Sequence, residues 1–396
     1  MTLGVPEAGK QAGLATLAAL GLLFPQALPI ILGLLLLITV TEAWAGKALT
    51  RLGAWRNVRT GALVFLLPLL ALMLSPWAEW PGPAAGRAAR LALELAEAVA
   101  LGAILLAFPR ETAVQRGKAA CWGLAAGALL AVIDLSTGGG LTGWLRGQPV
   151  DAVTYGRSAV LAALVVIPLL LAARVPLWQR IGLILPGILL ALLSANLAAK
   201  LILPVAALAA LIGLWRFGPG LLAGLISLAV LLPGVLPMRL TPADNCALWA
   251  GKPSAAHRLL IWTYADGLID QRPWTGWGLD AARRLGAVAP EAAVPDCARA
   301  ALGRDTVPLL PLHPHNGALQ LWLELGLAGA VFLPLLMIGL IRPLFQRSPL
   351  ERATATSAFA GASVPLLVSF GLWQGWWLAG LALLWGLVIL LMTPRS

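Results

Sequence analysis

The sequence predicts an all-α polytopic membrane protein with about twelve transmembrane helices and one large loop on the outer side of the membrane. Hydrophobic residues make up 60% of the 396 residues and charged residues only 11%, against roughly 25% charged residues in soluble domains. Apolar runs recur along the whole chain, and runs of about 20 apolar residues cross the hydrocarbon as helices. One long polar segment interrupts them, late in the chain.

The predicted spans follow the apolar runs in order. They cover residues 11–24, 27–43, 59–76, 88–108, 116–135, 157–174, 178–194, 197–215, 218–238, 317–341, 353–372 and 376–393. The first nine form one unit over residues 1–238, and the last three form another over 317–396. Weak breaks near Pro25 and Ser194 keep ten to thirteen spans compatible with the sequence. No small-residue cleavage site follows the first run, which favours a retained helix over a cleaved signal peptide.

Charge fixes the predicted orientation. The formal net charge is +11, but most basic residues lie in short loops between apolar runs, so the charge does not indicate a nucleic-acid-binding protein. Under the positive-inside rule these loops place the N-terminus in the cytoplasm. The long polar segment then lies on the outer side of the membrane.

This outer loop covers residues 239–316 and is nearly neutral. A structureless loop of that length is improbable unless it is functional. Residues 254–271 place apolar side chains at helical spacing, and residues 272–285 read as a Pro/Gly turn that leads into a second short helix. The loop holds Cys246 and Cys297, which can form a disulfide in an oxidising compartment; the sequence favours neither the bridge nor two free thiols. Cys121 lies within an apolar span.

Two of the three histidines, His313 and His315, lie beside Asn316 just before the tenth span. Pro314 suits the first turn of a helix, which would place His315 in that turn. Nearby helical N–H groups disfavour a positive charge there, so the imidazole should stay neutral. A neutral imidazole can accept a proton near neutral pH, as a general base must.

A polar stripe continues from this cluster into the apolar span. Asn316, Gln320 and Glu324 recur every four residues and share one side of a helix. A carboxylate at that depth should face the protein interior or a water-filled cavity. In the purely structural alternative, His313 and His315 are interfacial residues and Glu324 pairs with a structural cation. Two histidines, an asparagine and the stripe together favour a functional site.

Three cations at the outer ends of spans or in the loop are candidates for binding phosphate. Arg157 opens the sixth span, Lys200 lies one turn into the eighth, and Arg258 begins the predicted loop helix. Arg presents a bidentate fork to phosphate and Lys a point charge. Alternatively, Arg157 is a snorkelling side chain. The separate alternative for Lys200 is an ion pair with an acid of the fourth or fifth span, namely Glu94, Glu97 or Asp134.

No metal site and no nucleotide-binding site are supported by the sequence. The outer side has no Asp-x-Asp pair, and the chain has no Cys-x-x-Cys, His-x-x-x-His or Gly-rich nucleotide loop. The polar cluster also faces away from the cytoplasm, where nucleotide donors are found. We therefore expect no metal and no cofactor.

Two stretches resemble the O-antigen ligase and O-antigen polymerase superfamily. "HPHNGALQLWLELGLAG" resembles its His-Asn segment, and "HRLLIWTYADGLIDQRPWTGWGLDAARRL" resembles its Arg-containing loop followed by Pro-x-x-Gly-x-Gly. The closely spaced motifs cover roughly residues 150–330. The resemblance implies a GT-C-like architecture, a multi-pass location in the bacterial inner membrane, and an active site facing the periplasm, which makes the outer loop a large periplasmic loop.

The resemblance also implies the chemistry. Members move a glycan from undecaprenyl pyrophosphate to an acceptor, which for the ligases is the lipid A core oligosaccharide. The superfamily's essential histidine corresponds to His315, the expected general base, and its loop arginine to Arg258. Arg157 resembles another arginine of related sequences. Where the superfamily has Ser-Arg, this chain departs, and Lys200 is the expected substitute.

The implied mechanism is an inverting, metal-independent glycosyl transfer between two lipid-anchored substrates. Arg157, Lys200 and Arg258 would bind the pyrophosphate. His313, Asn316, Gln320 and Glu324 would support the site. Two other functions remain open: an O-antigen polymerase or protein O-oligosaccharyltransferase of the same superfamily, and, from a different class, a lipid or solute transporter.

Overall fold

The computed structural model describes residues 7–45, 63–140, 143–144, 147, 153–171, 176–234 and 246–392. The start of the predicted outer loop and parts of several shorter predicted loops lie outside these ranges. The helices of the first part are α1 (Glu7–Leu23), α2 (Leu28–Ala45), α4 (Leu66–Leu74), α5 (Pro81–Ala107), α6 (Arg110–Ser136), α8 (Gly156–Leu171), α9 (Leu177–Leu193), α10 (Leu197–Leu214) and α11 (Gly218–Leu231). Short 3-10 turns flank several of them: η1 (Pro25–Ala27), η3 (Leu63–Phe65), η4 (Ser75–Trp77) and η5 (Leu232–Gly234).

The second part begins with short elements and ends with long helices. The short elements are α12 (Cys246–Gly251), α13 (Pro253–Gln271), α14 (Ala281–Val288), β1 (Glu291–Ala293), α15 (Asp296–Leu302) and β2 (Thr306–Pro308), in which β1 and β2 pair antiparallel. The C-terminal helices are α16 (Gly317–Ile341), α17 (Pro349–Val368) and α18 (Gly375–Met392), with the turn η6 (Arg342–Gln346) after α16. The helix expected over 254–271 and the second short helix after it are both present.

Every predicted span overlaps a helix of the structure. Four helical segments in the described ranges are long and apolar enough to cross a membrane, namely Pro25–Ala43, Glu111–Ser136, Leu197–Leu214 and Gly317–Gln346. Five shorter apolar helices accompany them. The chain is thus a mostly helical membrane protein, while the count of twelve spans, the domain boundaries and the GT-C-like arrangement remain predictions.

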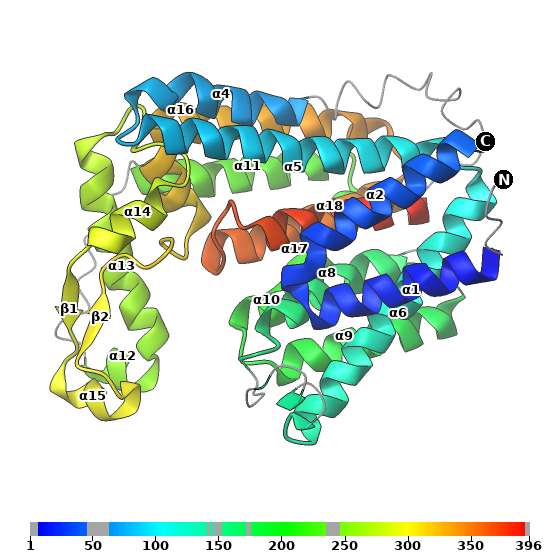
Figure 1. The fold of residues 1–396 in the computed structure, drawn as a ribbon, viewed down its shortest axis with the longest axis horizontal. Coiled ribbons are helices and arrows are strands. Elements are labelled where there is room, and N and C mark those ends of the chain that lie inside the picture. The colour runs from blue at the N-terminus through cyan, green and yellow to red at the C-terminus, as the bar shows by residue number, and fades with distance from the viewer. Residues whose placement is uncertain are drawn as a thin grey trace.

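Small residues let the long helices approach closely, as is common between membrane helices. On α6, a Cβ at Gly123 would lie 2.0 Å from the carbonyl oxygen of Ala15 on α1. On α10, a Cβ at Gly213 would lie 2.8 Å from the Cα of Ala353 on α17. The packed pairs α1 with α6 and α10 with α17 form much of the body of the protein (Figure 1).

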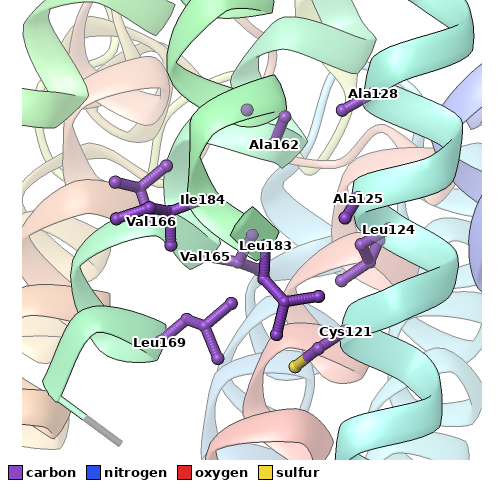
Figure 2. A pocket seen from close by; sticks show the side chains of 11 residues that line it. Cys121, Leu124, Ala125, Ala128, Ala162, Val165, Val166, Leu169, Leu183 and Ile184 are labelled. Atoms are coloured by element: carbon purple, nitrogen blue, oxygen red, sulfur yellow. The ribbon is translucent and has the colours of Figure 1, made fainter. Parts of the chain in front are cut away.

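A small cavity lies between α6, α8 and α9, and Figure 2 shows its lining. The lining is aliphatic except for the buried thiol of Cys121. The cavity volume of about 10 Å³ is roughly what one water molecule needs. This cavity is therefore a packing defect and not a substrate site.

The short elements α12, α13, α15, β1 and β2 form a lobe at one end of the molecule (Figure 1). The lobe has its own small core, built from Trp249, Ala256, Val294, Ala298 and Val307. Cys246 and Cys297 are joined by a disulfide that links α12 to α15. The bridge and the core together give the lobe an internal framework, with α13 connecting it to α16.

Candidate functional site

The helix that follows the histidine cluster begins where the predicted tenth span begins, which is after Pro314 and His315. α16 starts at Gly317, and Asn316 is its N-cap, with the side-chain Oδ1 accepting from the N–H of Ala318 at 3.0 Å and of Leu319 at 3.1 Å. Asn is a strong N-cap residue because it satisfies these otherwise unpaired donors. The expectation that Pro314 and His315 occupy the first helical turn is wrong. His315 lies just before the cap with a left-handed φ of 54°.

The hydrogen bonds of His315 define its tautomer. Its Nδ1 lies 2.8 Å from the carbonyl oxygen of Ser369, and because a carbonyl only accepts, Nδ1 must carry the proton. The backbone N–H of His315 donates to Nδ1 of His313 at 3.1 Å. In the neutral ring, Nε2 of His315 is then the lone-pair nitrogen, and it has no hydrogen-bond partner in the described part of the chain. This is the form that a general base requires.

Burial keeps both rings neutral. It lowers the pKa of His315 below its usual value, although the hydrogen bond to the Ser369 carbonyl acts to raise that pKa. The charges of Arg258 and His257 lower it further. Burial also lowers the pKa of His313 to about 3, with the charge of His315 adding most to the shift. The sequence predicted a neutral imidazole from the helix N-terminus, but desolvation is the main cause.

The helix α13 places Arg258 beside the two histidines. Two bonds attach α13 to the segment that leads into the cluster: Trp262 Nε1 donates to the Pro314 carbonyl at 3.0 Å, and the His257 ring lies 2.8 Å from the Pro308 carbonyl. The Arg258 side chain is half-buried, and burial lowers its pKa. A partly desolvated guanidinium next to a neutral imidazole suits an anionic substrate group.

Arg157 reaches the same region through the turn between α17 and α18, residues 369–374. Its guanidinium lies 5.3 Å from the centroid of the Trp376 ring. Trp376 packs edge-on against Phe370 at 4.8 Å, and Phe370 directly follows Ser369, the partner of His315. The structure thus connects Arg157 to the histidine cluster through one short segment.

Lys200 has a different setting from the one predicted. Its side chain is exposed, and among the described residues it forms no hydrogen bond or ion pair. Of the three predicted alternative partners, Glu94 pairs with Arg87 at 3.2 Å and Asp134 accepts from Tyr155 at 2.8 Å, while Glu97 forms no ion pair with Lys200 in the described residues. The structure therefore does not bring Lys200 to His315 through any described contact.

The polar stripe below the cluster is buried and fully used. Glu324 has 0% of its surface exposed and accepts hydrogen bonds from the Gln320 side chain at 2.9 Å, from the backbone N–H of Asp280 at 2.6 Å, and from the Trp373 indole. No cation pairs with it in the described ranges, which therefore give no support to the alternative of a structural ion pair. Gln320 in turn accepts from the Leu372 N–H at 2.9 Å. The stripe joins α16 to the α17–α18 turn that contacts His315.

The helix α16 is broken directly below Glu324, which the sequence did not predict. Gly326 has φ 59° and ψ −156°. The loop of residues 273–278 fills the break: Trp277 and Gly278 donate to the carbonyls of Leu323 and Glu324, both at 2.9 Å. On the other side, Leu327 and Ala328 donate to the carbonyls of Pro273 and Trp274 at 2.7 and 3.2 Å. The loop thereby replaces two helical bonds with four.

The fit of this loop depends on glycine on both sides. A Cβ at Gly276, where φ is +67°, would lie 2.4 Å from the carbonyl carbon of Glu324. A Cβ at Gly326 would lie 2.5 Å from the carbonyl carbon of Trp274. The Pro-x-x-Gly-x-Gly stretch therefore holds Glu324 in place. Its glycines were the one available sequence signal for this contact, while nothing in the sequence marked the Ser369 carbonyl.

A metal site is not formed by the described residues, in which no three His, Cys, Asp or Glu side chains group in a way that could hold an ion. The site instead consists of a neutral histidine, two arginines and a buried network of hydrogen bonds. Such a set can remove a proton from a hydroxyl group and bind an anion. The residues of this site come from α8, α13, α16 and the α17–α18 turn.

Comparison with known proteins gives a consistent result. Residues 152–333 match the family described as O-antigen ligase, a stretch that holds Arg157, Lys200, Arg258 and His315. The chain is 32% identical over 171 residues to a putative polysaccharide ligase of Rickettsia conorii, covering 42% of this chain and 38% of that one. It is 30% identical over 168 residues to a putative polysaccharide ligase of Rickettsia felis, covering 42% and 39%. These matches span about two fifths of the relatives' lengths.

Proposed function

We propose that this chain, which belongs to the O-antigen ligase superfamily, is a glycosyltransferase that moves an O-antigen glycan from undecaprenyl pyrophosphate to the lipid A core oligosaccharide. We place the reaction at the periplasmic face of the bacterial inner membrane. The observation that carries the proposal is the free Nε2 of a neutral His315 next to the half-buried Arg258. A base and an anion-binding cation are the two groups that this reaction needs.

In the proposed reaction, Nε2 of His315 removes the proton from an acceptor hydroxyl. The hydroxyl oxygen attacks the anomeric carbon of the donor glycan, and the bond from that carbon to the pyrophosphate oxygen breaks. The electron pair of that bond stays on the pyrophosphate, and the proton stays on His315 until the site empties. One direct displacement inverts the anomeric carbon without a covalent glycosyl-enzyme.

The cations stabilise the leaving group. Arg258 and Arg157 bind the pyrophosphate as its negative charge grows, which is electrostatic preorganisation in a partly dehydrated site. Lys200 is the third proposed ligand of the pyrophosphate, and its exposure leaves it free to turn toward a bound lipid carrier. Because the energy is stored in the anomeric phosphate ester, the reaction needs no cofactor, and with cationic side chains at the pyrophosphate we propose that it needs no metal. Both lipid anchors keep the substrates at the membrane surface, where alignment does most of the work.

The broken helix α16 bears on the transporter alternative. Discontinuous helices of transporters use freed backbone groups to hold substrates or ions. Here residues 273–278 bond the freed groups on both sides of Gly326. This closed break favours a structural role over a transport site.

The proposal is tested by substitution of the base in proteoliposomes that contain donor and lipid A core. We expect His315→Ala to reduce transfer by at least about 100-fold, which is the contribution typical of a general base. His257→Gln is the matched control, since glutamine can keep the bond to the Pro308 carbonyl, and it should retain most activity. Transfer by His315→Ala at a near-normal rate would refute the assignment.

The acceptor is tested in the same system. Transfer to lipid A core supports the ligase, elongation of a second carrier-linked glycan indicates a polymerase, and transfer to a protein acceptor indicates a protein O-oligosaccharyltransferase.

A further inference from the structure

Three exposed arginines form a surface patch that the proposed reaction has not used. Arg283 and Arg284 lie on α14, and Arg90 lies on α5. Arg283 has one carboxylate nearby, Asp280 at 3.8 Å. Arg90 and Arg284 have no carboxylate within 4.0 Å in the described part of the chain, whereas their neighbour Arg87 is paired with Glu94. The Arg90–Arg283–Arg284 patch therefore has three guanidinium groups and one carboxylate.

The residues just before α14 pack on α5, and the charges of all three arginines act on Asp280. Leu279, just before α14, packs in one cluster with Ala88 and Leu91 of α5, which flank Arg90 in the sequence. The guanidinium of Arg284 lies 5.8 Å from the centroid of Trp80, the residue that precedes α5. Core contacts thus fix the backbone that carries the patch, and the ring of Trp80 lies near one of its guanidinium groups.

The patch also adjoins the histidine cluster. A Cβ at Gly286 of α14 would lie 2.5 Å from the carbonyl oxygen of Pro311, so the backbone of α14 rests on the segment two residues before His313. Arg283 is one helical turn earlier, and its charge acts on both Asp280 and His313. The patch is therefore close to His313, on the side of the cluster that faces α14.

Arginines from two different helices reach the α17–α18 turn, Arg157 from α8 and Arg87 from α5. Arg157 contacts Trp376 at the α18 end. Arg87, which precedes Arg90 by one turn of α5, donates to the carbonyl of Trp373. In Figure 1 this turn lies between α14 and α8. A direct displacement needs the acceptor and the leaving pyrophosphate on opposite faces of the anomeric carbon, so an anion site away from Arg157 suits the acceptor.

We propose that the Arg90–Arg283–Arg284 patch binds phosphoryl groups of the acceptor glycolipid. The inference rests on the proposed function, which supplies an acceptor, and it adds the substrate class that the patch would recognise: a glycolipid whose sugars carry phosphate near the attacking hydroxyl. Guanidinium groups bind phosphate through paired charge-assisted hydrogen bonds, and the single carboxylate of Asp280 lies within the field of all three arginines. Binding at this patch would orient the acceptor hydroxyl toward Nε2 of His315.

The first experiment measures transfer kinetics with two acceptors, lipid A core with its phosphates and the same acceptor after phosphatase treatment. We expect the double variant Arg283→Gln/Arg284→Gln to raise KM for the phosphorylated acceptor by about tenfold or more, with kcat and the donor KM unchanged. With the dephosphorylated acceptor, wild type and variant should have equal KM. Arg304→Gln, an exposed arginine of the same loop, is the matched control. An equal KM increase with both acceptors would overturn the proposal.

The second experiment separates the acceptor from ordinary anionic lipids. In proteoliposomes of zwitterionic phosphatidylcholine alone, the KM difference should persist. If it appears only when phosphatidylglycerol is present, the patch binds membrane headgroups and the proposal is wrong.

Direct binding of phosphorylated acceptor without donor separates this inference from the transfer reaction. Binding that is lost in the double variant supports the patch even if wild type transfers no glycan, whereas active transfer with unchanged acceptor binding overturns the patch alone.

Discussion

The chemistry of His315 is decided by its nearest neighbours and not by its histidine identity alone. The Ser369 carbonyl holds the proton on Nδ1, and burial opposes a second proton. His313 is the other histidine of the cluster, but its Nδ1 accepts a hydrogen bond from the backbone N–H of His315. The two rings differ in role for that reason: His313 fixes the backbone of the cluster, and His315 presents a lone pair on Nε2.

The pH dependence of transfer follows from this environment. Because burial lowers the pKa of His315 below its usual 6.5, the base is unprotonated throughout the neutral range. We expect kcat/KM for the acceptor to be constant between about pH 7 and 8, and to fall about tenfold per pH unit once the pH drops below that lowered pKa. Rates measured from pH 4.5 to 8 check this. An acid limb centred above 6.5 would contradict a buried, neutral base.

Arg258 should act on the donor. We expect Arg258→Ala to lower kcat/KM for the undecaprenyl-pyrophosphate donor by about 100-fold, since a charge-assisted contact to the leaving group is worth roughly 3 kcal/mol when it strengthens in the transition state. Assays in which two donors, or two acceptors, compete for the enzyme show whether the substitution affects use of the donor or choice of the acceptor. A change in acceptor preference with normal use of the donor would mean that the role belongs to another residue.

At the scale of elements, the site depends on one loop that repairs one broken helix. The 273–278 loop bonds the backbone on both sides of Gly326, and Glu324 then accepts from the backbone of Asp280 just after that loop. Through Gln320 and Trp373 the same network reaches the α17–α18 turn. Distortion of the loop should therefore affect His315 through its partner, the Ser369 carbonyl, although the loop itself supplies no catalytic group.

Two glycines with nearly equal φ provide the test of this arrangement. Gly276 has φ +67° and a Cβ position 2.4 Å from Glu324, whereas Gly303 has φ +62° and open space around it. Gly303→Ala should cost only the left-handed strain of about 1–2 kcal/mol. Gly276→Ala should cost at least about 3 kcal/mol and reduce transfer, because the loop must move. Thermal unfolding in detergent measures the stability lost by each variant. Equal losses would mean that the close approach of Gly276 to Glu324 is not needed.

Across the whole molecule, local apolar runs and distant contacts were predictable to different degrees. Each hydrophobic run gave a helix because hydrophobicity is a local property, and the Asn316 to Glu324 stripe was predicted because helical spacing fixes which residues share a face. The break at Gly326 lies within a continuous apolar run, and it is satisfied by residues about 50 positions earlier in the chain. The Ser369 carbonyl, likewise, is 54 residues from His315. The glycines of residues 273–278 signalled a close approach but not its partner, and the Ser369 carbonyl had no signal at all.

The lobe of α12, α13, α15, β1 and β2 has a small core, so its disulfide should matter for the stability of that part. Cys246 and Cys297 are 51 residues apart, and closing a loop of that length stabilises a fold by about 4 kcal/mol in the chain-entropy account. We expect Cys246→Ser to make the lobe sensitive to limited proteolysis while the membrane helices stay resistant. Cys121→Ser is the control for loss of a cysteine elsewhere, and equal protease resistance of both variants would contradict a structural role for the bridge.

The central claim is that this protein makes a covalent glycosidic bond at the His315 site. It is tested most directly by incubating the purified wild-type protein in proteoliposomes with a defined undecaprenyl-pyrophosphate glycan and lipid A core, with EDTA present, and measuring the mass and anomeric configuration of the product. We expect an acceptor that gains the intact glycan through a linkage inverted relative to the donor. Movement of the donor across the bilayer without any such product, or a product that retains the donor's configuration, would contradict it.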